Sequence, residues 1–402
     1  MTVRNKLAAL FSRTGKTKAI DHIVKPSFKQ HEEIRTRDPA QPFCTFLGMR
    51  VNCGPLGLKG APDFLFRNNG DGTFTDVTRQ AGVTDIPLHY GLTVTWADVD
   101  DDGFPDIVVA NDSRPNYLYH NRGDGTFEEL GILSGLATNA DGRAQAFMGM
   151  GVGDYDHDGR DDFFFTTFSN DSYTLHRNNG KLDFSDVSQR AGFGAITVPF
   201  MGWGTQFVDY DNDGWLDVFI ANGHIYPKID DHSKFTSYEQ RTLLFRNLQN
   251  GTFADISGNL GPAITTPKST RGLALGDLFN DGNTHAVLNN IRRTPTLLRS
   301  RGADRAGHWI SLKLVGDPSR KVPRDAMGTV VYCTANGFRQ RGEVASGRSY
   351  VSQNDLRIHF GLGKAERVDK LEIMWSNRIR EMVELPAVDR FYTIVQGKGI
   401  QP

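Results

Sequence analysis

The sequence of 402 residues is poor in cysteine, carries almost no net charge and has no long apolar run. Its formal net charge is −1, and no uncharged apolar stretch approaches the roughly 18 residues of a membrane helix. No glycine-rich loop occurs in the strand–helix context of a nucleotide site. We therefore expect no membrane span and no nucleotide cofactor, and a 38% apolar content excludes a disordered chain.

The three cysteines cannot all pair with one another. Cys44 and Cys53 are close enough in sequence to form a disulfide in an oxidising compartment, whereas Cys333 stands alone. The alternative is three free thiols. No signal peptide is visible, because the apolar stretch 7–11 is short and is soon followed by more Lys and Arg.

The near-zero net charge conceals three blocks of opposite sign. Residues 1–42 carry a net charge of +5, residues 43–306 of −11 and residues 307–402 of +5. The acidic block should attract cations, and it lacks the excess of Lys and Arg that nucleic-acid binding needs. We divide the chain into a basic segment (1–42), a repeat region (43–306), a C-terminal domain (307–396) and a short tail (397–402).

An aspartate-rich segment recurs four times in the acidic block, at 98–106, 154–162, 209–217 and 277–285. A second motif alternates with it at 65–74, 118–127, 175–184 and 244–253, where an apolar strand meets a turn of Asn, Gly and Asp. Each unit of about 55 residues holds about four short strands, which is typical of a β-propeller blade.

The pattern therefore predicts an all-β chain: a β-propeller followed by a small β-rich domain. The repeat region has room for about four to five recognisable blades, so the ring is expected to be small, incomplete or open. A parallel β-solenoid is the alternative fold, although its repeats are usually shorter.

The first three aspartate-rich loops have Asp at positions 1, 3, 5 and 9 and Gly at position 6. Several carboxylates turned toward one centre suit a hard cation, and Ca²⁺ tolerates their irregular geometry better than Mg²⁺. We predict about three Ca²⁺ sites; the alternative is a set of solvated turns. The expected ligands are Asp98, Asp100, Asp102, Asp106, Asp154, Asp156, Asp158, Asp162, Asp209, Asp211, Asp213 and Asp217.

The fourth loop is a degraded copy of the other three. Phe279 stands at its position 3 and His285 at its position 9. Because two carboxylates are lost there, we expect this loop to hold no cation.

The loops, with their interleaved Arg-Asn-x-Gly-Asp-Gly-Thr-Phe turns, resemble FG-GAP/VCBS-type repeats. Segments 308–316, 324–328, 349–363 and 368–375 resemble the ASPIC/UnbV domain. Together they are similar to the cartilage acidic protein-like family over roughly residues 43–396. The resemblance implies a calcium-binding β-propeller and an extracellular or periplasmic location.

Two features depart from that family. The family's Trp-Pro-Ser-Gly-like turn reads Trp-Ser-Asn-Arg at 375–378. Family propellers commonly have about seven blades behind a secretion signal, more than residues 43–306 can supply.

Three functions fit these observations. The first is a calcium-stabilised binding or adhesion module for protein or glycan, because no nucleophile–base motif is recognisable. The second is an enzyme on a propeller face near the insertion 222–240, where His224, Tyr226, Asp231 and His232 could perform acid–base chemistry. The third is a scaffold in which the basic C-terminal domain docks on the acidic repeats. The oligomeric state stays open.

Overall fold

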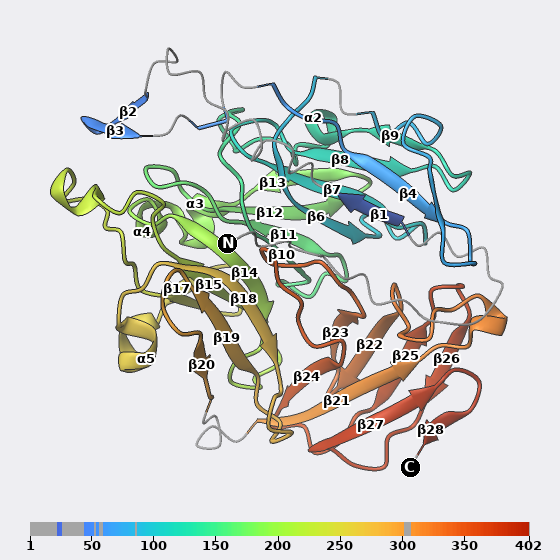
Figure 1. Cartoon of the computed structure of the whole chain (residues 1–402). Coiled ribbons are helices and arrows are strands. Elements are labelled where there is room, and N and C mark those ends of the chain that lie inside the picture. The colour runs from blue at the N-terminus through green and yellow to red at the C-terminus, as the bar shows by residue number, and fades with distance from the viewer. Residues whose placement is uncertain are drawn as a thin grey trace.

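The computed structural model describes residues 22–25, 44–51, 54–55, 59–84, 87–300 and 307–401. Strands dominate these residues, and each helix among them is a single short turn. The strands form a succession of small sheets that follow one another in space (Figure 1). The prediction of an all-β chain is therefore confirmed.

Three four-stranded sheets carry the complete repeats. In each of them neighbouring strands pair antiparallel in chain order, which excludes a parallel solenoid in this part of the chain. The strands are β6 (Gly91–Ala97), β7 (Asp106–Asn111), β8 (Tyr117–Asn121) and β9 (Phe127–Glu129); β10 (Met150–Gly153), β11 (Asp162–Phe165), β12 (Thr174–Gly180) and β13 (Asp183–Asp186); and β14 (Gly202–Val208), β15 (Asp217–Asn222), β16 (Leu243–Asn247) and β17 (Phe253–Asp255).

Two three-stranded sheets flank the complete repeats. One is β1 (His22–Lys25), β4 (Phe64–Asn68) and β5 (Phe74–Asp76), and the other is β18 (Thr270–Gly276), β19 (His285–Asn290) and β20 (Thr296–Leu298). Because β1 pairs with β4, the first sheet reaches into the basic segment that we had set apart at residues 1–42. The β-branched pair at 23–24 suits a strand, although no repeat pattern marks it.

A separate hairpin joins β2 (Cys44–Phe46) to β3 (Met49–Val51). Cys44 is disulfide-bonded, and Cys333 is a buried free thiol. Cys53, the partner that we expect for Cys44, lies outside the described residues.

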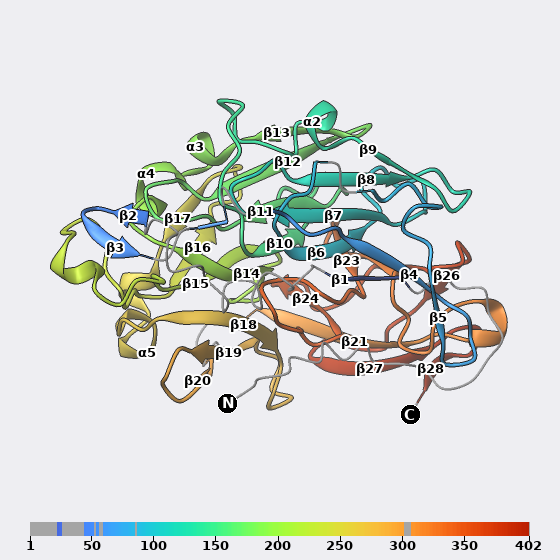
Figure 2. The same cartoon turned by 45° about the horizontal axis from the view of Figure 1, so that its top comes forward.

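The second strand of a repeat is buried on both sides. In β11, Phe163 joins the apolar cluster shared with the preceding sheet, and Phe164 joins the cluster shared with the following sheet. This division follows from the alternation of side chains along a strand. Each sheet is thus held between its two neighbours, and Figure 2 shows β7, β11 and β15 following one another in this way.

The first strands of the repeats lie closest together, as β14 contacts both β10 and β18. Glycine makes this approach possible. A Cβ atom added to Gly149, next to β10, would lie 1.8 Å from the carbonyl oxygen of Trp203 in β14. The glycine beside β10 therefore allows neighbouring first strands to pack closely.

The helices only shape the connections. They are α2 (Gly131–Ser134), α3 (Ser188–Ala191), α4 (Gly194–Thr197) and α5 (Pro262–Thr265), with 3-10 turns η2 (Ile229–Asp231), η3 (Ser257–Asn259) and η5 (Pro318–Arg320). None of the helices in the described ranges has the length and apolarity to cross a membrane.

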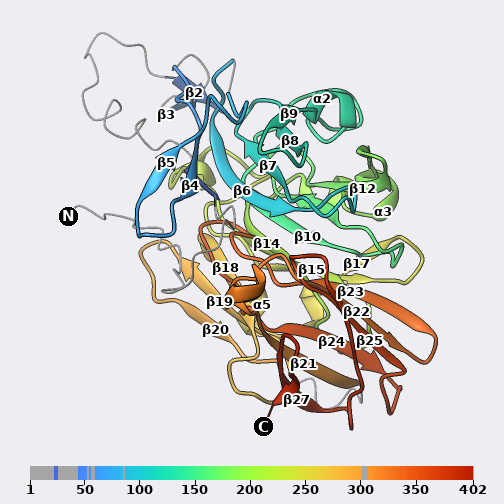
Figure 3. The same ribbon diagram turned by 90° about the vertical axis from the view of Figure 1, so that its right-hand side faces the viewer.

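The C-terminal region folds as two four-stranded sheets, which Figure 3 shows side by side. One sheet has the order β24-β21-β27-β28 and the other β23-β22-β25-β26. Between them lies an apolar core of their own around the fully buried Trp375. The strands are β21 (His308–Val315), β22 (Val330–Ala335), β23 (Phe338–Glu343), β24 (Ile358–Gly363), β25 (Lys370–Met374), β26 (Arg380–Val383), β27 (Arg390–Val395) and β28 (Gly399–Gln401).

The end of this domain differs from the predicted boundary at residue 396. Strand β28 lies within the segment 397–402 that we had treated as a tail, and it pairs with β27. Gly397, with a φ of 71°, turns the chain back onto the sheet.

Candidate metal centres

Each aspartate-rich loop joins the first strand of a sheet to the second. Residues 98–106 link β6 to β7, 154–162 link β10 to β11, 209–217 link β14 to β15, and 277–285 link β18 to β19. Because the sheets repeat the same strand order, the four loops occupy equivalent positions. The structure thus places them as loops between strands, as the sequence predicted.

The glycine at position 6 and the aspartate at position 1 close each complete loop. The glycine has a positive φ, which side chains disfavour, and its N–H donates to the Oδ2 atom of the first aspartate. The pairs are Gly103 and Asp98 (2.7 Å), Gly159 and Asp154 (3.0 Å), and Gly214 and Asp209 (2.8 Å).

The aspartate at position 9 is buried and fixed by two backbone N–H groups. Its Oδ1 accepts from the N–H of an asparagine in the third strand, and its Oδ2 accepts from the N–H of the residue at loop position 2. The donors are Asn121 and Val99 for Asp106, Asn178 and Tyr155 for Asp162, and Asn247 and Tyr210 for Asp217. The hairpin motif and the loop motif are therefore parts of one structural unit.

Burial makes the ionised form of these carboxylates costly. It raises the pKa of Asp98 to about 7, with repulsion from Asp101 as the next cause, and it raises the pKa of Asp154 to about 7, with repulsion from Asp161 next. Burial also raises the pKa of Asp106 to about 6. The pKa values of the third loop's buried Asp209 and Asp217 are raised well above the usual range for the same reason.

One oxygen of the first aspartate is left without a partner in two of the loops. The Oδ1 atoms of Asp98 and Asp154 are buried and accept no hydrogen bond from the described part of the chain, which is a costly state for a carboxylate oxygen. A cation would satisfy both the orphaned oxygen and the surplus negative charge. The donor set of the loops, oxygen only, fits a hard cation such as Ca²⁺.

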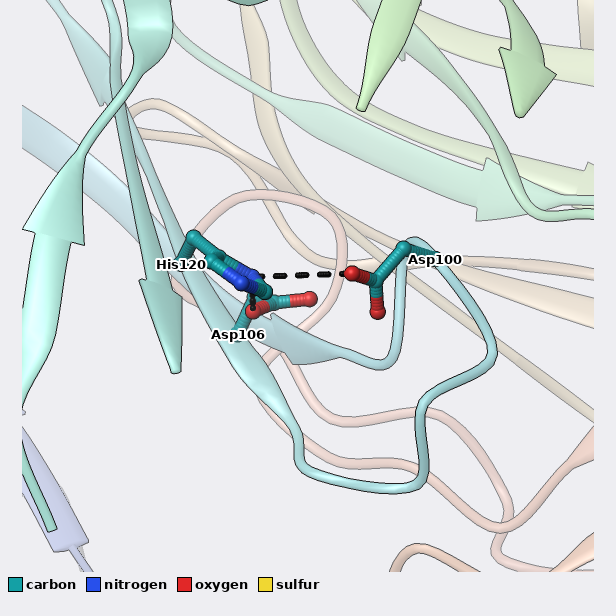
Figure 4. A group of neighbouring side chains, drawn as sticks. All are labelled: Asp100, Asp106 and His120. Atoms are coloured by element: carbon teal, nitrogen blue, oxygen red, sulfur yellow. Dashed lines mark hydrogen bonds and ion pairs between the residues drawn. The ribbon is translucent and has the colours of Figure 1, made fainter. Parts of the chain in front are cut away.

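The loops bring together most of the predicted ligands, but not all in one group. Oxygen atoms within 4.8 Å of one another come from Asp98, Asp100 and Asp102; from Asp154, Asp156 and Asp162; and from Asp209, Asp211 and Asp217. Asp106 instead groups with Asp100 and His120 (Figure 4). Asp158 and Asp213 lie outside these groups and face arginines of the third strands.

These basic side chains of the third strands are site residues that the sequence analysis missed. Arg177 donates to Asp158 (2.9 Å), Arg246 lies 3.2 Å from Asp211, and His120 Nδ1 lies 3.1 Å from Asp106 Oδ1. The sequence did carry a signal for these three side chains, because each lies one position before the asparagine of the hairpin motif. The positive charges of Arg177 and Arg246 partly balance the second and third loops.

The fourth loop, which we expect to hold no cation, also brings possible ligands together. Asp277, Asp281 and His285 each offer an atom within 4.8 Å of the others. The histidine at position 9 thus changes the donor type without removing the donor, and the prediction that this loop holds no cation stays a prediction.

The insertion 222–240 does not assemble the acid–base group that an enzyme would need. His224 is buried, its Nδ1 accepts from the Tyr226 N–H (3.1 Å), and its Nε2 lies 3.1 Å from Ser169 Oγ. Burial lowers the pKa of His224 to about 4. Asp231 and His232 are exposed, so the four residues do not converge.

The C-terminal domain contacts all four aspartate-rich loops. Arg378 donates to the Asp102 carbonyl, Arg341 pairs with Asp161, the Gly363 N–H donates to the Asn212 carbonyl (2.9 Å), and Arg357 donates to the Asp277 carbonyl (2.6 Å). Three of these four contacts use arginine. The basic domain thus docks on the acidic repeats, as the scaffold hypothesis anticipated.

Family comparisons agree with this architecture. The FG-GAP-like repeat family matches residues 59–109, 98–165 and 154–220, and the ASPIC and UnbV family matches residues 319–401. The chain is therefore a protein of FG-GAP-like repeats with a C-terminal ASPIC and UnbV domain, as its sequence motifs predicted.

Among characterised proteins it is similar to cartilage acidic protein 1. The Homo sapiens protein is 24% identical over 342 residues, which cover 81% of this chain and 47% of the relative. The Xenopus tropicalis protein is 29% identical over 285 residues, covering 68% and 39%. The chain thus spans less than half the length of the curated relatives it matches.

The structural similarity to a solved protein is low. An Agrocybe aegerita lectin, described by its specific recognition of non-reducing terminal N-acetylglucosamine, matches with a TM-score of 0.35 at 16% identity, covering 79% of this chain and 69% of the lectin. That score is too low to support an inference about fold or ligand.

Proposed function

We propose that this chain is a calcium-binding extracellular interaction module that presents a β-propeller surface to a protein or glycan. The observation that carries the proposal is the pair of buried, unpartnered Oδ1 atoms of Asp98 and Asp154, each in a cluster of further carboxylates. Three carboxylates a few ångströms apart repel one another strongly in a partly buried loop. A bound divalent cation removes that repulsion.

The expected donors are the carboxylates of the first three loops. In loop one they are those of Asp98, Asp100 and Asp102, at positions 1, 3 and 5, whereas the groups in loops two and three combine positions 1, 3 and 9. Bound Ca²⁺ would supply the positive charge that these loops lack, while the glycine N–H holds the first carboxylate in place. Calcium would thereby stabilise the connections between first and second strands.

We also propose that the C-terminal domain completes the propeller ring. Its sheets lie between the first and the last repeat sheet in Figure 1. Ser349 pairs with Met150 of β10, and its hydroxyl donates to the Leu273 carbonyl of β18 (3.0 Å). Tyr350 packs on Trp203 of β14 with ring centroids 4.9 Å apart. One loop of the C-terminal domain thus contacts the first strands of three sheets.

We propose an extracellular or periplasmic location, which the similarity to cartilage acidic protein 1 and the disulfide of Cys44 support. Disulfides persist in oxidising compartments. The binding partner is a protein or a glycan, and binding that needs Ca²⁺ would link the loops to the partner surface.

The proposal is tested by measuring bound calcium in the full chain. Equilibrium dialysis with elemental analysis should find about three Ca²⁺ per chain, and Asp154→Asn should remove one of them. Asp141→Asn is the matched control, because Asp141 is an exposed carboxylate that pairs only with Arg143. No bound calcium, or equal stoichiometry in both variants, would refute the assignment.

The nature of the partner is tested separately. A glycan array and a panel of extracellular-matrix proteins are probed with the calcium-loaded chain and again in EDTA. Binding that disappears in EDTA supports a calcium-dependent interaction surface. Binding of equal strength in both conditions would contradict the link between the loops and recognition.

A further inference from the structure

The fourth loop differs chemically from the other three. It joins β18 to β19, and its position 9 is His285 where the others have a buried aspartate. Position 3 is Phe279, whose ring lies 4.8 Å from the His285 ring and covers it. The loop therefore offers two carboxylates and one imidazole in place of four carboxylates.

His285 is buried and lacks a hydrogen-bond partner. Its side chain has 0% exposure, and neither ring nitrogen makes a hydrogen bond with any residue that the structure describes. The Nδ1 atom lies 3.8 Å from Asp277 Oδ1 and the Nε2 atom 3.7 Å from Asp281 Oδ1, and both separations are too long for hydrogen bonds. A buried imidazole without a partner is costly, so this geometry calls for a ligand between the ring and the carboxylates.

The two carboxylates are already held in place. Asp277 accepts the N–H groups of Asp281 (3.1 Å) and Gly282 (2.7 Å), and Arg299 donates to Asp281 Oδ2 (3.2 Å). Asp281 Oδ1 lies on the side of His285 and accepts from the N–H (3.2 Å) and the Nδ2 atom (3.1 Å) of Asn283. The loop is also anchored from the C-terminal domain, since Arg357 donates to Asn280 Oδ1 (2.7 Å) and to the Asp277 carbonyl.

We propose that Asp277, Asp281 and His285 form a binding site for a divalent transition cation of the Zn²⁺ or Mn²⁺ type. Imidazole nitrogen combined with carboxylate oxygen is a donor set that such ions prefer. Ca²⁺ takes oxygen ligands, and more of them than this loop offers. The three side chains lie within the spacing that one ion can bridge, and their two negative charges match a divalent ion.

The site lies in a different loop from the proposed calcium sites and offers different donor atoms. The other histidine–carboxylate group, around His120, differs because His120 Nδ1 already lies at hydrogen-bond distance from Asp106. His285 has no such partner in the part of the chain that the structure describes. The proposal therefore stands whether or not the first three loops bind Ca²⁺.

The test is zinc binding to the full chain in excess Ca²⁺, measured by elemental analysis after dialysis and by competition with a chromophoric chelator. One Zn²⁺ per chain is expected to remain bound when Ca²⁺ is saturating. Since loss of a single outer-sphere partner weakens metal affinity about 10–100-fold, His285→Gln should weaken zinc binding at least that much. His308→Gln is the matched control, because His308 is half-exposed and pairs with Asp389.

Co²⁺ substitution provides a readout that does not depend on a variant. Its visible spectrum in the wild-type chain should show nitrogen ligation, and that signature should be absent in His285→Gln. Calcium stoichiometry and melting temperature of the same samples show whether the variant is folded. If His285→Gln does not fold, the wild-type Co²⁺ spectrum decides the question.

Three results would overturn the proposal. One is that the chain saturated with Ca²⁺ binds no zinc above the background of the measurement. The second is equal zinc affinity in wild type and in a folded His285→Gln variant. The third is loss of zinc only in His120→Gln, which would place the ion in the first loop. Failure of the calcium proposal would be seen separately, in the calcium stoichiometry.

Discussion

The sharpest prediction concerns how pH changes the effect of calcium on stability. In the metal-free chain the pKa of Asp98 and of Asp154 is about 7, against 3.8 for an ordinary aspartate. These groups therefore favour the folded state fully below about pH 4, and that contribution is lost as the pH rises through 7. One pKa unit corresponds to about 1.4 kcal/mol, so the loss is at most about 4 kcal/mol for each carboxylate.

Calcium binding reverses this dependence, because the ion binds the ionised form. At pH 5, two units below the raised pKa values, each of the two loops must release a proton to bind Ca²⁺, which weakens its apparent affinity about 100-fold. That factor corresponds to about 2.7 kcal/mol per loop. We therefore expect the rise in Tm on adding calcium to be large at pH 7.5 and small at pH 5.

The assay is thermal unfolding of the full chain with excess Ca²⁺ or with EDTA at both pH values. Each kcal/mol should shift Tm by a few degrees in a protein of this size. Calorimetric titration at pH 6 in two buffers of different ionisation enthalpy measures the proton release directly, and Asp154→Asn should reduce it. An equal Tm rise at both pH values, or binding without proton release, would refute the electrostatic reasoning.

Three further predictions follow from other parts of the structure. Arg341→Met leaves the buried Asp161 without its ion-pair partner and should lower the free energy of unfolding by about 3–5 kcal/mol in urea denaturation; full stability would contradict it. Gly149→Ala should yield little soluble protein, because its Cβ would collide with a neighbouring backbone carbonyl, whereas Gly258→Ala, with open space around it, should behave as wild type. Arg177→Gln removes positive charge beside the second loop and should tighten calcium binding in titration calorimetry; weaker binding would show that the guanidinium orients ligands.

The local parts of the site could be predicted from the sequence because their causes are local. Alternate aspartates, a glycine at position 6 and a following apolar strand specify a turned loop between strands within nine residues. The aspartate at position 9 lies with those at positions 1 and 3 in the second and third loops, whereas in the first loop it lies with Asp100 and His120. The repetition at about 55 residues then indicated successive sheets.

The remaining features depend on residues that are distant in sequence. Arg177 reaches Asp156 across 21 residues, and Arg341 reaches Asp161 across 180 residues. Pairings of this kind depend on register and on domain docking, which no local pattern encodes. The grouping in the fourth loop was not indicated by the sequence pattern for a different reason, since His285 replaces the aspartate of that pattern and yet lies with Asp277 and Asp281.

The docking of the C-terminal domain on all four loops couples the loops to one another. Ion binding and docking of the C-terminal domain are linked reciprocally. An ion that favours the docked state is itself bound more tightly in that state. Arg378 at the first loop and Arg357 at the fourth belong to one body, so its detachment would disturb both loops at once. Ion occupancy at separate loops is thereby expected to be cooperative, with the C-terminal domain as the element that transmits the coupling.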